Sequence, residues 1–279
     1  MPGTAPVRIG PEVRQRRHTQ YFTGTIRAFS PVFLDTDVDM TEVLAHRAAH
    51  PGHSLVSYIA QAAGRALAAH PEANAALRGR LWPRLAHYTG VHAKITLDKT
   101  LDGHRVVLAT VVPDVDTADL DAIQEHVSHF RDGDAQTMPE FAAVRTLHKL
   151  PRPLGLPLFR LTTRSLRRRG QLLGTVAITS LGHRPINGFH SVGGTTITLG
   201  VGQVADRPVV RDGALAIAPT MRLNLAFDHR VIDGAEAADL LTAIKDGLEH
   251  YPAATKSEHD DTTADAGAEN AGALLAATD

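Results

Sequence analysis

The sequence predicts an α/β protein, because helix-like and strand-like segments alternate along its 279 residues. In the first half, apolar residues recur three and four positions apart, which is the spacing of one helix face. Two dipeptides suited to tight turns, Asp102-Gly103 and Asp212-Gly213, lie between runs rich in β-branched residues. The last third is rich in such runs and ends in another helix-like segment.

The first part of the chain is predicted to form strands and then two helices. An apolar, threonine-rich run from Tyr21 to Val38 follows a basic opening and favours strands. A helix is expected to begin after Asp39. A second helix is expected from Leu55, where one apolar stripe continues to Ala69 before His70-Pro71 ends it.

The middle of the chain is predicted to contain a hairpin followed by helices. The residues 91–97 and 105–112 favour two strands around Asp102-Gly103, and an apolar stripe favours a helix from Thr117 to Phe130. The polar residues 131–137 are expected to form a loop. Prolines interrupt the segment from Phe141 to Arg169, which therefore suggests two short helices around a bend.

The last third is predicted to be mostly strands. The candidates are residues 173–178, 194–201 and 220–227. The third run alternates apolar and other residues, the period of two that a strand with one buried face requires. It leads directly to His229, and a helix is expected from Ala235 to His250.

The composition limits the possible functions. The absence of cysteine excludes disulfides, thiolate metal sites and cysteine nucleophiles, and the net charge of −1 argues against strong general affinity for nucleic acid. No apolar run is long enough to span a membrane, so a cytoplasmic protein is expected. The predicted organisation is a flexible N-terminus over 1–13, one folded domain over 14–252, and a disordered acidic tail over 253–279.

One basic stretch needs a separate explanation. Eight Lys and Arg residues and no carboxylate lie between Arg145 and Arg169. A solvated helix face, an oligomer contact, an anionic ligand and a membrane surface all remain open as explanations.

The segment from Phe227 to Gly234 carries the clearest chemical signal. It places His229 and two carboxylates, Asp228 and Asp233, at the exit of a strand, and Gly234 permits a sharp entry into the next helix. Imidazole is the usual general base near neutral pH, although a lone histidine beside aspartate is more often structural. Spacing alone therefore leaves both roles open.

The segment Asp-His-Arg-Val-Ile-Asp-Gly over 228–234 resembles the active-site signature of the acyltransferase component of 2-oxoacid dehydrogenase complexes. Four weaker segments resemble that family in the same order along the chain: Val-Asp-Met-Thr over 38–41, His-Pro-Glu-Ala-Asn-Ala over 70–75, Gly-Thr-Val-Ala-Ile-Thr-Ser-Leu-Gly over 174–182, and Leu-Gly-Val-Gly over 199–202. The resemblance covers nearly all of the predicted folded domain. It implies a chloramphenicol acetyltransferase-like fold, a two-layer α+β sandwich in which helices flank a mixed sheet, assembled as a trimer.

The resemblance also implies roles for single residues. His229 would be the general base, and the hydroxyl of Thr179 would stabilise an oxyanion, with Ser180 as the alternative one position later. Asp233 would hold the site's architecture through an arginine, for which Arg16, Arg17 and Arg230 are candidates. Asp228 would be a structural neighbour.

The function implied by this resemblance is acyl transfer. An acyl group, expected to be acetyl, would pass from an acyl-coenzyme A to a hydroxyl, thiol or amine of a small or carrier-bound acceptor. O-acetylation in tetronate-type specialised metabolism, as in antibiotic biosynthesis, is one version. The chain shows no lipoyl-type segment and is expected to be a stand-alone catalytic domain, active as a homotrimer with sites at subunit interfaces.

Two alternatives remain at the level of sequence. The protein could be the dihydrolipoyl acyltransferase component of a complex, served by a lipoyl domain on another chain, or a trimeric scaffold without activity. No covalently bound lipoyl group, metal, nucleic acid or membrane partner is expected. The histidines at 87, 92, 183 and 190 are not assigned to a metal, and Gly200-Val201-Gly202 is better explained by a packed strand than by a dinucleotide site.

Overall fold

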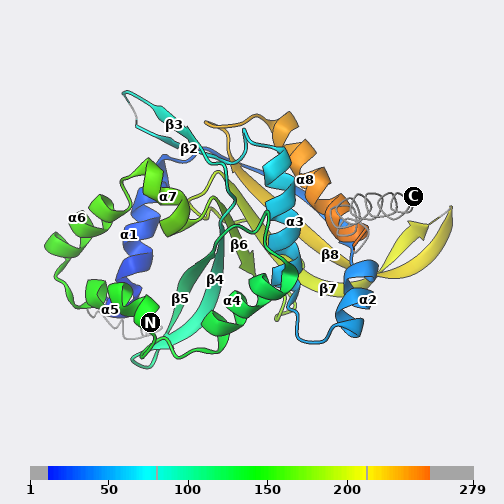
Figure 1. Cartoon of the computed structure of the whole chain (residues 1–279), viewed down its shortest axis with the longest axis horizontal. Helices are drawn as coiled ribbons and strands as arrows, with labels where there is room; N and C mark the ends of the chain where they lie inside the picture. The colour runs from blue at the N-terminus through cyan, green and yellow to red at the C-terminus, as the bar shows by residue number, and fades with distance from the viewer. Residues whose placement is uncertain (1–11, 80, 212, 252–279) are drawn as a thin grey trace, which may run out of the picture.

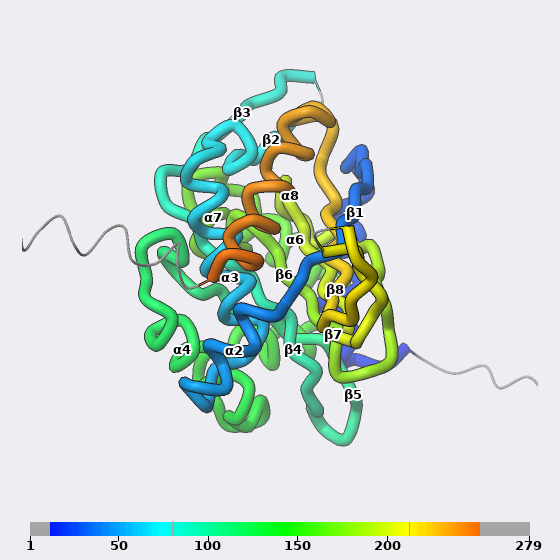
Figure 2. Tube along the Cα trace, turned by 90° about the vertical axis from the view of Figure 1, so that its right-hand side faces the viewer, coloured from blue at the N-terminus to red at the C-terminus, as the bar shows by residue number. Residues whose placement is uncertain are grey.

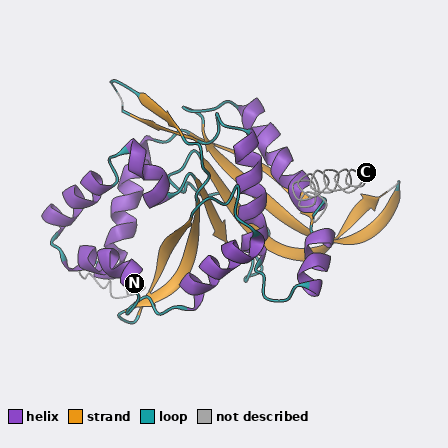
Figure 3. Ribbon diagram, viewed as in Figure 1, coloured by secondary structure: helices purple, strands orange, loops and turns teal. Residues whose placement is uncertain are grey.

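The structure is a computed structural model that describes residues 12–79, 81–211 and 213–251. Most of the predicted flexible N-terminus, over 1–11, and all of the predicted acidic tail, over 253–279, lie outside these residues. The described chain combines one large mixed sheet with helices beside it, which confirms the predicted fold class (Figures 1 and 3).

The main sheet has six strands in the order β1-β8-β7-β6-β4-β5. Strand β6 runs parallel to both β4 and β7, and the other neighbours are antiparallel. The six strands have the following bounds: β1 Pro31–Asp39, β4 Ala93–Leu101, β5 His104–Val112, β6 Val176–Ser180, β7 Ile197–Arg211 and β8 Ala214–Asp228. The hairpins predicted around Asp102-Gly103 and near Gly213 are present, with both glycines at positive φ.

One face of the sheet packs on a layer of helices. These are α2 Thr41–Ala49, α3 Leu55–Ala69, α4 Leu120–Asp132 and α8 Gly234–Glu249. Apolar side chains from alternate strand positions, such as Ile178, Leu199 and Leu225, are fully buried against helix residues such as Ile59 and Leu240. Helices α3 and α8 lie side by side over the sheet (Figure 2). The predicted stripes on these helices form the core.

A second group of helices lies beside β5 and was only partly predicted. It comprises η1 Arg14–Arg16, α1 Arg17–Thr25, η2 Ile26–Ala28, η3 Pro139–Phe141, α5 Ala142–Lys149, α6 Arg152–Thr162 and α7 Leu166–Leu173. The predicted strand from Tyr21 is wrong over its first half, because Tyr21 is buried in α1 and its ring lies 6.1 Å from that of Phe159 in α6. Tertiary packing overrides strand propensity there.

The predicted pair of helices over 141–169 is three helices. Pro151 is the N-cap residue of α6, just after the end of α5. Pro153 occupies the first turn of α6, where the missing N–H of proline loses no helical hydrogen bond. Helix α7 continues to Leu173, so the strand expected from that residue begins only at Val176.

A short hairpin was missed by the sequence analysis. Strands β2 Ala75–Arg78 and β3 Arg84–His87 pair outside the main sheet, and the hairpin projects from the body in Figure 1. Its strands are only four residues long and lack the alternation that would mark them.

The connection from β6 to β7 covers the second face of the sheet. The backbone carbonyl of Phe189 lies where a side chain on Gly200 would project, and that of Asn187 lies similarly over Gly202. The two glycines of the predicted Leu-Gly-Val-Gly segment therefore allow this loop to lie directly on strand β7.

Candidate functional site

Strand β8 delivers His229 to the end of the sheet. The backbone N–H of His229 donates to the carbonyl of Ser30 at 2.9 Å, and its ring packs 5.5 Å from that of Phe227. The turn that follows is closed by Val231 N–H, which donates to the carbonyl of Asp228 at 2.8 Å. The side chain of His229 is 47% exposed, so the imidazole can meet a ligand.

Asp233 lies against the imidazole. Its Oδ1 is 3.3 Å from Nδ1 of His229, and it precedes the first turn of α8 without capping it through its side chain. A carboxylate on Nδ1 favours the tautomer that carries the proton there and leaves Nε2 free to accept one. The contact therefore places a carboxylate beside Nδ1 of His229 within a single chain, with 88% of the Asp233 side chain exposed.

Asp228 and Arg230 form a separate buried pair. Arg230 donates through Nε to Oδ1 of Asp228 at 2.8 Å and through Nη2 to Oδ2 at 2.5 Å. Only 2% of the Asp228 side chain is exposed, and its hydrogen bonds raise the pKa of Arg230. The guanidinium also lies 5.1 Å from the ring centroid of Phe29. This pair makes Asp228 the structural neighbour that the sequence suggested.

Two of the three arginines considered for Asp233, Arg17 and Arg230, bind elsewhere within the described chain, and no ion pair of Arg16 with Asp233 is found there. Arg17 donates to the carbonyls of His148 and Leu150, at 3.1 and 2.7 Å, and contacts Glu12. Arg230 is held by Asp228. No ion pair from either arginine to Asp233 is found among the described residues.

Thr179 lies far from His229 in one chain. The sheet aligns Thr179 with Gly200 on β7 and, through it, with Asn224 on β8. His229 lies five positions beyond Asn224 and two strands across, so the two Cα atoms are roughly 19 Å apart. The structure thus joins His229 to Asp233 but not to Thr179.

The two candidate hydroxyl groups differ in their surroundings. Thr179 and Ser180 are both partly buried at the end of β6 and face opposite sides of the sheet, because adjacent strand residues alternate. The Ser180 hydroxyl accepts a hydrogen bond from Gly182 N–H at 3.4 Å. No hydrogen bond of the Thr179 hydroxyl is found within the described part of the chain, so it is free to donate to a ligand.

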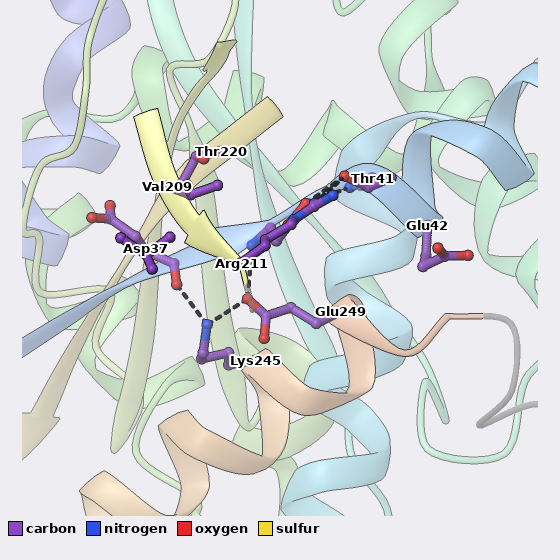
Figure 4. Close-up of a pocket in the computed structure, with 10 residues that line it drawn as sticks. Asp37, Thr41, Glu42, Val209, Arg211, Thr220, Lys245 and Glu249 are labelled. Carbon is purple, nitrogen blue, oxygen red and sulfur yellow. Dashed lines mark hydrogen bonds and ion pairs between the residues drawn. The ribbon is translucent and has the colours of Figure 1, made fainter. Parts of the chain in front are cut away.

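Two shallow pockets lie on the surface, one at His229 and one elsewhere. One, of about 470 Å³, surrounds His229 and includes Glu72, Arg230 and Asp233. The other, of about 430 Å³, lies between α2, α8 and the β7–β8 hairpin (Figure 4). There Lys245 binds the carbonyl of Asp37 and the carboxylate of Glu249, so the charges largely satisfy one another. The His229 pocket is the better candidate for chemistry.

Two predicted exclusions concern metals and membranes. Among residues 12–79, 81–211 and 213–251, no three or more histidine or carboxylate groups are arranged to hold a metal ion. In the same residues, no helix is both long and apolar enough to cross a bilayer.

The sequence was compared with protein families and with known proteins. Residues 161–255 match the family model of the 2-oxoacid dehydrogenases acyltransferase catalytic domain. A 47-residue segment is 51% identical to the dihydrolipoyllysine-residue acetyltransferase component of the pyruvate dehydrogenase complex of Bacillus subtilis, and 47% identical to that of Staphylococcus aureus. This segment is 17% of the present chain and 11% of each relative.

Solved structures extend the likeness to nearly the whole described chain. A dihydrolipoamide acetyltransferase from Azotobacter vinelandii aligns with a TM-score of 0.67 at 20% identity, covering 91% of this chain and 99% of that one. A probable dihydrolipoamide acetyltransferase from Listeria monocytogenes aligns with a TM-score of 0.63 at 18% identity, covering 88% and 94%. Residues 161–255 thus carry the sequence pattern of the 2-oxoacid dehydrogenase acyltransferase catalytic domain, on a fold shared with dihydrolipoamide acetyltransferase cores.

Proposed function

We propose that the protein is an acyltransferase that moves an acyl group, expected to be acetyl, from an acyl-coenzyme A to a hydroxyl, thiol or amine of an acceptor. The observation that carries this proposal is the contact between Asp233 and Nδ1 of His229 at a strand exit. It leaves Nε2 as a base facing a pocket, within a segment that matches an acyltransferase family.

The reaction follows from these groups. Nε2 of His229 takes the proton of the acceptor as its oxygen, sulfur or nitrogen attacks the thioester carbonyl. The resulting oxyanion accepts a hydrogen bond from Thr179. Collapse of the intermediate breaks the carbon–sulfur bond, and the departing thiolate of coenzyme A takes the proton back from the imidazolium. No group on the enzyme is acylated.

Thr179 must come from a second subunit in this scheme. Because roughly 19 Å separates it from His229 in one chain, one hydroxyl and one imidazole can meet only across an interface. We therefore propose a homotrimer with shared sites, since a closed ring lets each subunit supply both halves.

A comparison supports the chosen residues. The Azotobacter vinelandii enzyme has been investigated for catalytic roles of a serine, a histidine and an asparagine four positions after the histidine. The present proposal assigns Thr179, His229 and Asp233 to these three roles. Aspartate in place of asparagine adds a charge next to the imidazole.

The acceptor distinguishes two versions of the proposal. O-acetylation of a small molecule in tetronate-type biosynthesis is the version expected from the sequence. Transfer to dihydrolipoamide is the version supported by the likeness to dihydrolipoyllysine-residue acetyltransferase components. A scaffold without activity is disfavoured by the His229–Asp233 contact, which such a protein does not need.

The proposal is tested by measuring release of coenzyme A thiol from acetyl-coenzyme A with panels of hydroxyl, amine and thiol acceptors, including dihydrolipoamide. His229→Gln should lose about 10²–10⁴-fold in turnover, because it removes the base while keeping a polar group. Equal turnover by His229→Gln and the unmodified protein would refute the assigned mechanism.

A further inference from the structure

A buried lysine lies on the same face of the sheet as Thr179. Lys94 of β4 is in register with Ala177 of β6, and Thr179 follows two residues later. Residues aligned across strands, and residues two apart along a strand, point to the same face, so the two side chains share it. One strand spacing and two residues separate their Cα atoms by about 8 Å.

The ammonium group of Lys94 has little contact with water. Its residue is only 7% exposed, its Nζ donates to the carbonyl of Gly193, and the ring centroid of Phe22 in α1 lies 4.7 Å away. Arg169 of α7 donates to the next carbonyl, that of Gly194, at 2.6 Å. Two cations thus hold consecutive residues of the loop over the Thr179 face.

Within the described part of the chain, no carboxylate balances these two charges. Neither Lys94 nor Arg169 forms an ion pair with an acid among the described residues. Burial, together with the charge of Arg169, lowers the pKa of Lys94 to about 7. Burial also lowers the pKa of Arg169. Buried charges are ordinarily paired, because their desolvation is costly.

Lys99, five residues along the same strand, shows how this fold accommodates a lysine that has carboxylates nearby. Its Nζ donates to the carbonyls of Arg131 and Gly133, at 2.6 and 2.7 Å. Burial lowers the pKa of Lys99, and the carboxylates of Asp132 and Asp134 act against that shift. Lys94 has the backbone bond without the carboxylates, so a partner anion is the missing component.

We propose that Lys94, supported by Arg169, binds an anionic group of the acyl acceptor, such as a carboxylate. This inference rests on the proposed acyltransferase function. The acceptor would be an organic acid that carries the attacking hydroxyl, thiol or amine close to the ionised group. The ring of Phe22 would move aside to let the anion reach Nζ.

The acceptor is a better source of the anion than coenzyme A. With the thioester carbonyl at Thr179, the pantetheine arm holds the phosphates of coenzyme A many bonds away, whereas Lys94 is a near neighbour. A neutral acceptor such as dihydrolipoamide would leave the lysine unpaired. The preferred substrates are therefore hydroxy, amino or thiol acids.

Binding is tested with 3-hydroxybutyrate and its uncharged counterpart 1,3-butanediol, by calorimetry or NMR titration at constant ionic strength and pH 6.5. The variants are Lys94→Met and Lys94→Gln, the second keeping a donor for Gly193, and the matched control is Lys99→Met. Loss of the ammonium should weaken hydroxybutyrate binding about tenfold or more, while Lys99→Met and the diol show no change. Equal binding of hydroxybutyrate to all four proteins, or none to the unmodified protein, would overturn the inference.

Coenzyme A and pantetheine, titrated in parallel, separate the two anion sources. Their affinities should be the same in unmodified protein and Lys94→Gln. A loss confined to coenzyme A would assign the lysine to a phosphate and overturn the acceptor assignment. If His229→Gln abolishes turnover while Lys94→Gln changes neither binding nor the KM for acids, the acyltransferase function stands and this inference fails.

Discussion

The carboxylate of Asp228 is buried beneath the guanidinium of Arg230, two residues later in the same turn, with Nε and Oδ1 2.8 Å apart. The pair closes the turn that presents His229. Removing one partner leaves the other charge uncompensated, which is far more costly than removing both.

Arg230→Met should therefore lower the free energy of unfolding by about 3–5 kcal/mol, because the buried carboxylate loses its cation. The double variant Asp228→Asn/Arg230→Met should recover much of this loss. Urea denaturation at a fixed protein concentration measures both. A single variant within about 0.5 kcal/mol of the unmodified protein would mean that the pair is not a stabilising feature of the turn.

Thr179→Ala should lower kcat by about 10²–10³ with little change in stability, because it removes one donor to the oxyanion. Thr179→Ser keeps the hydroxyl and should retain most activity. Ser180→Ala is the matched control, since that hydroxyl lies on the other face and contacts Gly182. Acetyl transfer kinetics compare the three, and a larger loss in Ser180→Ala would exchange the two roles.

The separation of Thr179 from His229 predicts complementation between inactive chains. Co-assembled His229→Ala and Thr179→Ala chains in equal amounts should regain activity in about a quarter of the sites, because half the subunits supply each intact group at random. Co-assembly of His229→Ala with the double variant His229→Ala/Thr179→Ala should regain none. The test measures the acyl-transfer activity of the purified mixed trimers. A first mixture that is no more active than the second would rule out a shared site.

The sequence predicted the elements whose signal is local. The stripe from Leu55 to Ala69 and the alternation before Phe227 reappear as α3 and β8, because helix and strand periods determine which side chains face the core. The helix at Tyr21 was missed because its burial depends on Phe159, more than a hundred residues away. Long-range packing of this kind leaves no local pattern.

The candidate site likewise combines a feature with a local sequence signal and a feature that depends on long-range pairing. The contact of His229 with Asp233 lies within one short motif, although the sequence predicted an arginine as the partner of Asp233. The relation of Lys94 to Thr179 depends on the parallel pairing of β4 with β6, which spacing in the sequence does not reveal. The available signal was a single lysine within the apolar run over 91–97, at a position where both faces of a central strand are covered.

The buried lysine also predicts how stability depends on pH. Its pKa is lowered from 10.5 to about 7 in the folded protein, so between these values the unfolded chain binds more protons than the folded one. The free energy of unfolding should rise with pH from about 7 to about 10.5, relative to Lys94→Met. Parallel urea denaturation curves across that range measure the difference, and a constant offset would show that Lys94 keeps an ordinary pKa.

Two histidines predict a pH sensitivity of the same sign, but in the acid range, for the attachment of α1. Nδ1 of His18 lies 2.8 Å from Nε2 of His148, while Nε2 of His18 donates to the carbonyl of Val107, also at 2.8 Å. Burial lowers the pKa of His18, which favours its neutral form. With Nε2 donating, neutral His18 accepts at Nδ1, and His148 is the donor. Burial and the neighbouring His18 lower the pKa of His148 to about 4.

Stability from this pair is complete above pH 6.5, the ordinary histidine value, and is lost as the pH falls towards 4, because the unfolded chain takes up the proton first. His148→Gln keeps a donor that cannot titrate, so the advantage of the unmodified protein over this variant should shrink between pH 6.5 and 4.5. Hydrogen exchange of the α1 amides follows the attachment of that helix, and His129→Gln, at an exposed histidine, is the control. The same acid response in the unmodified protein and in His148→Gln would show that other groups release α1.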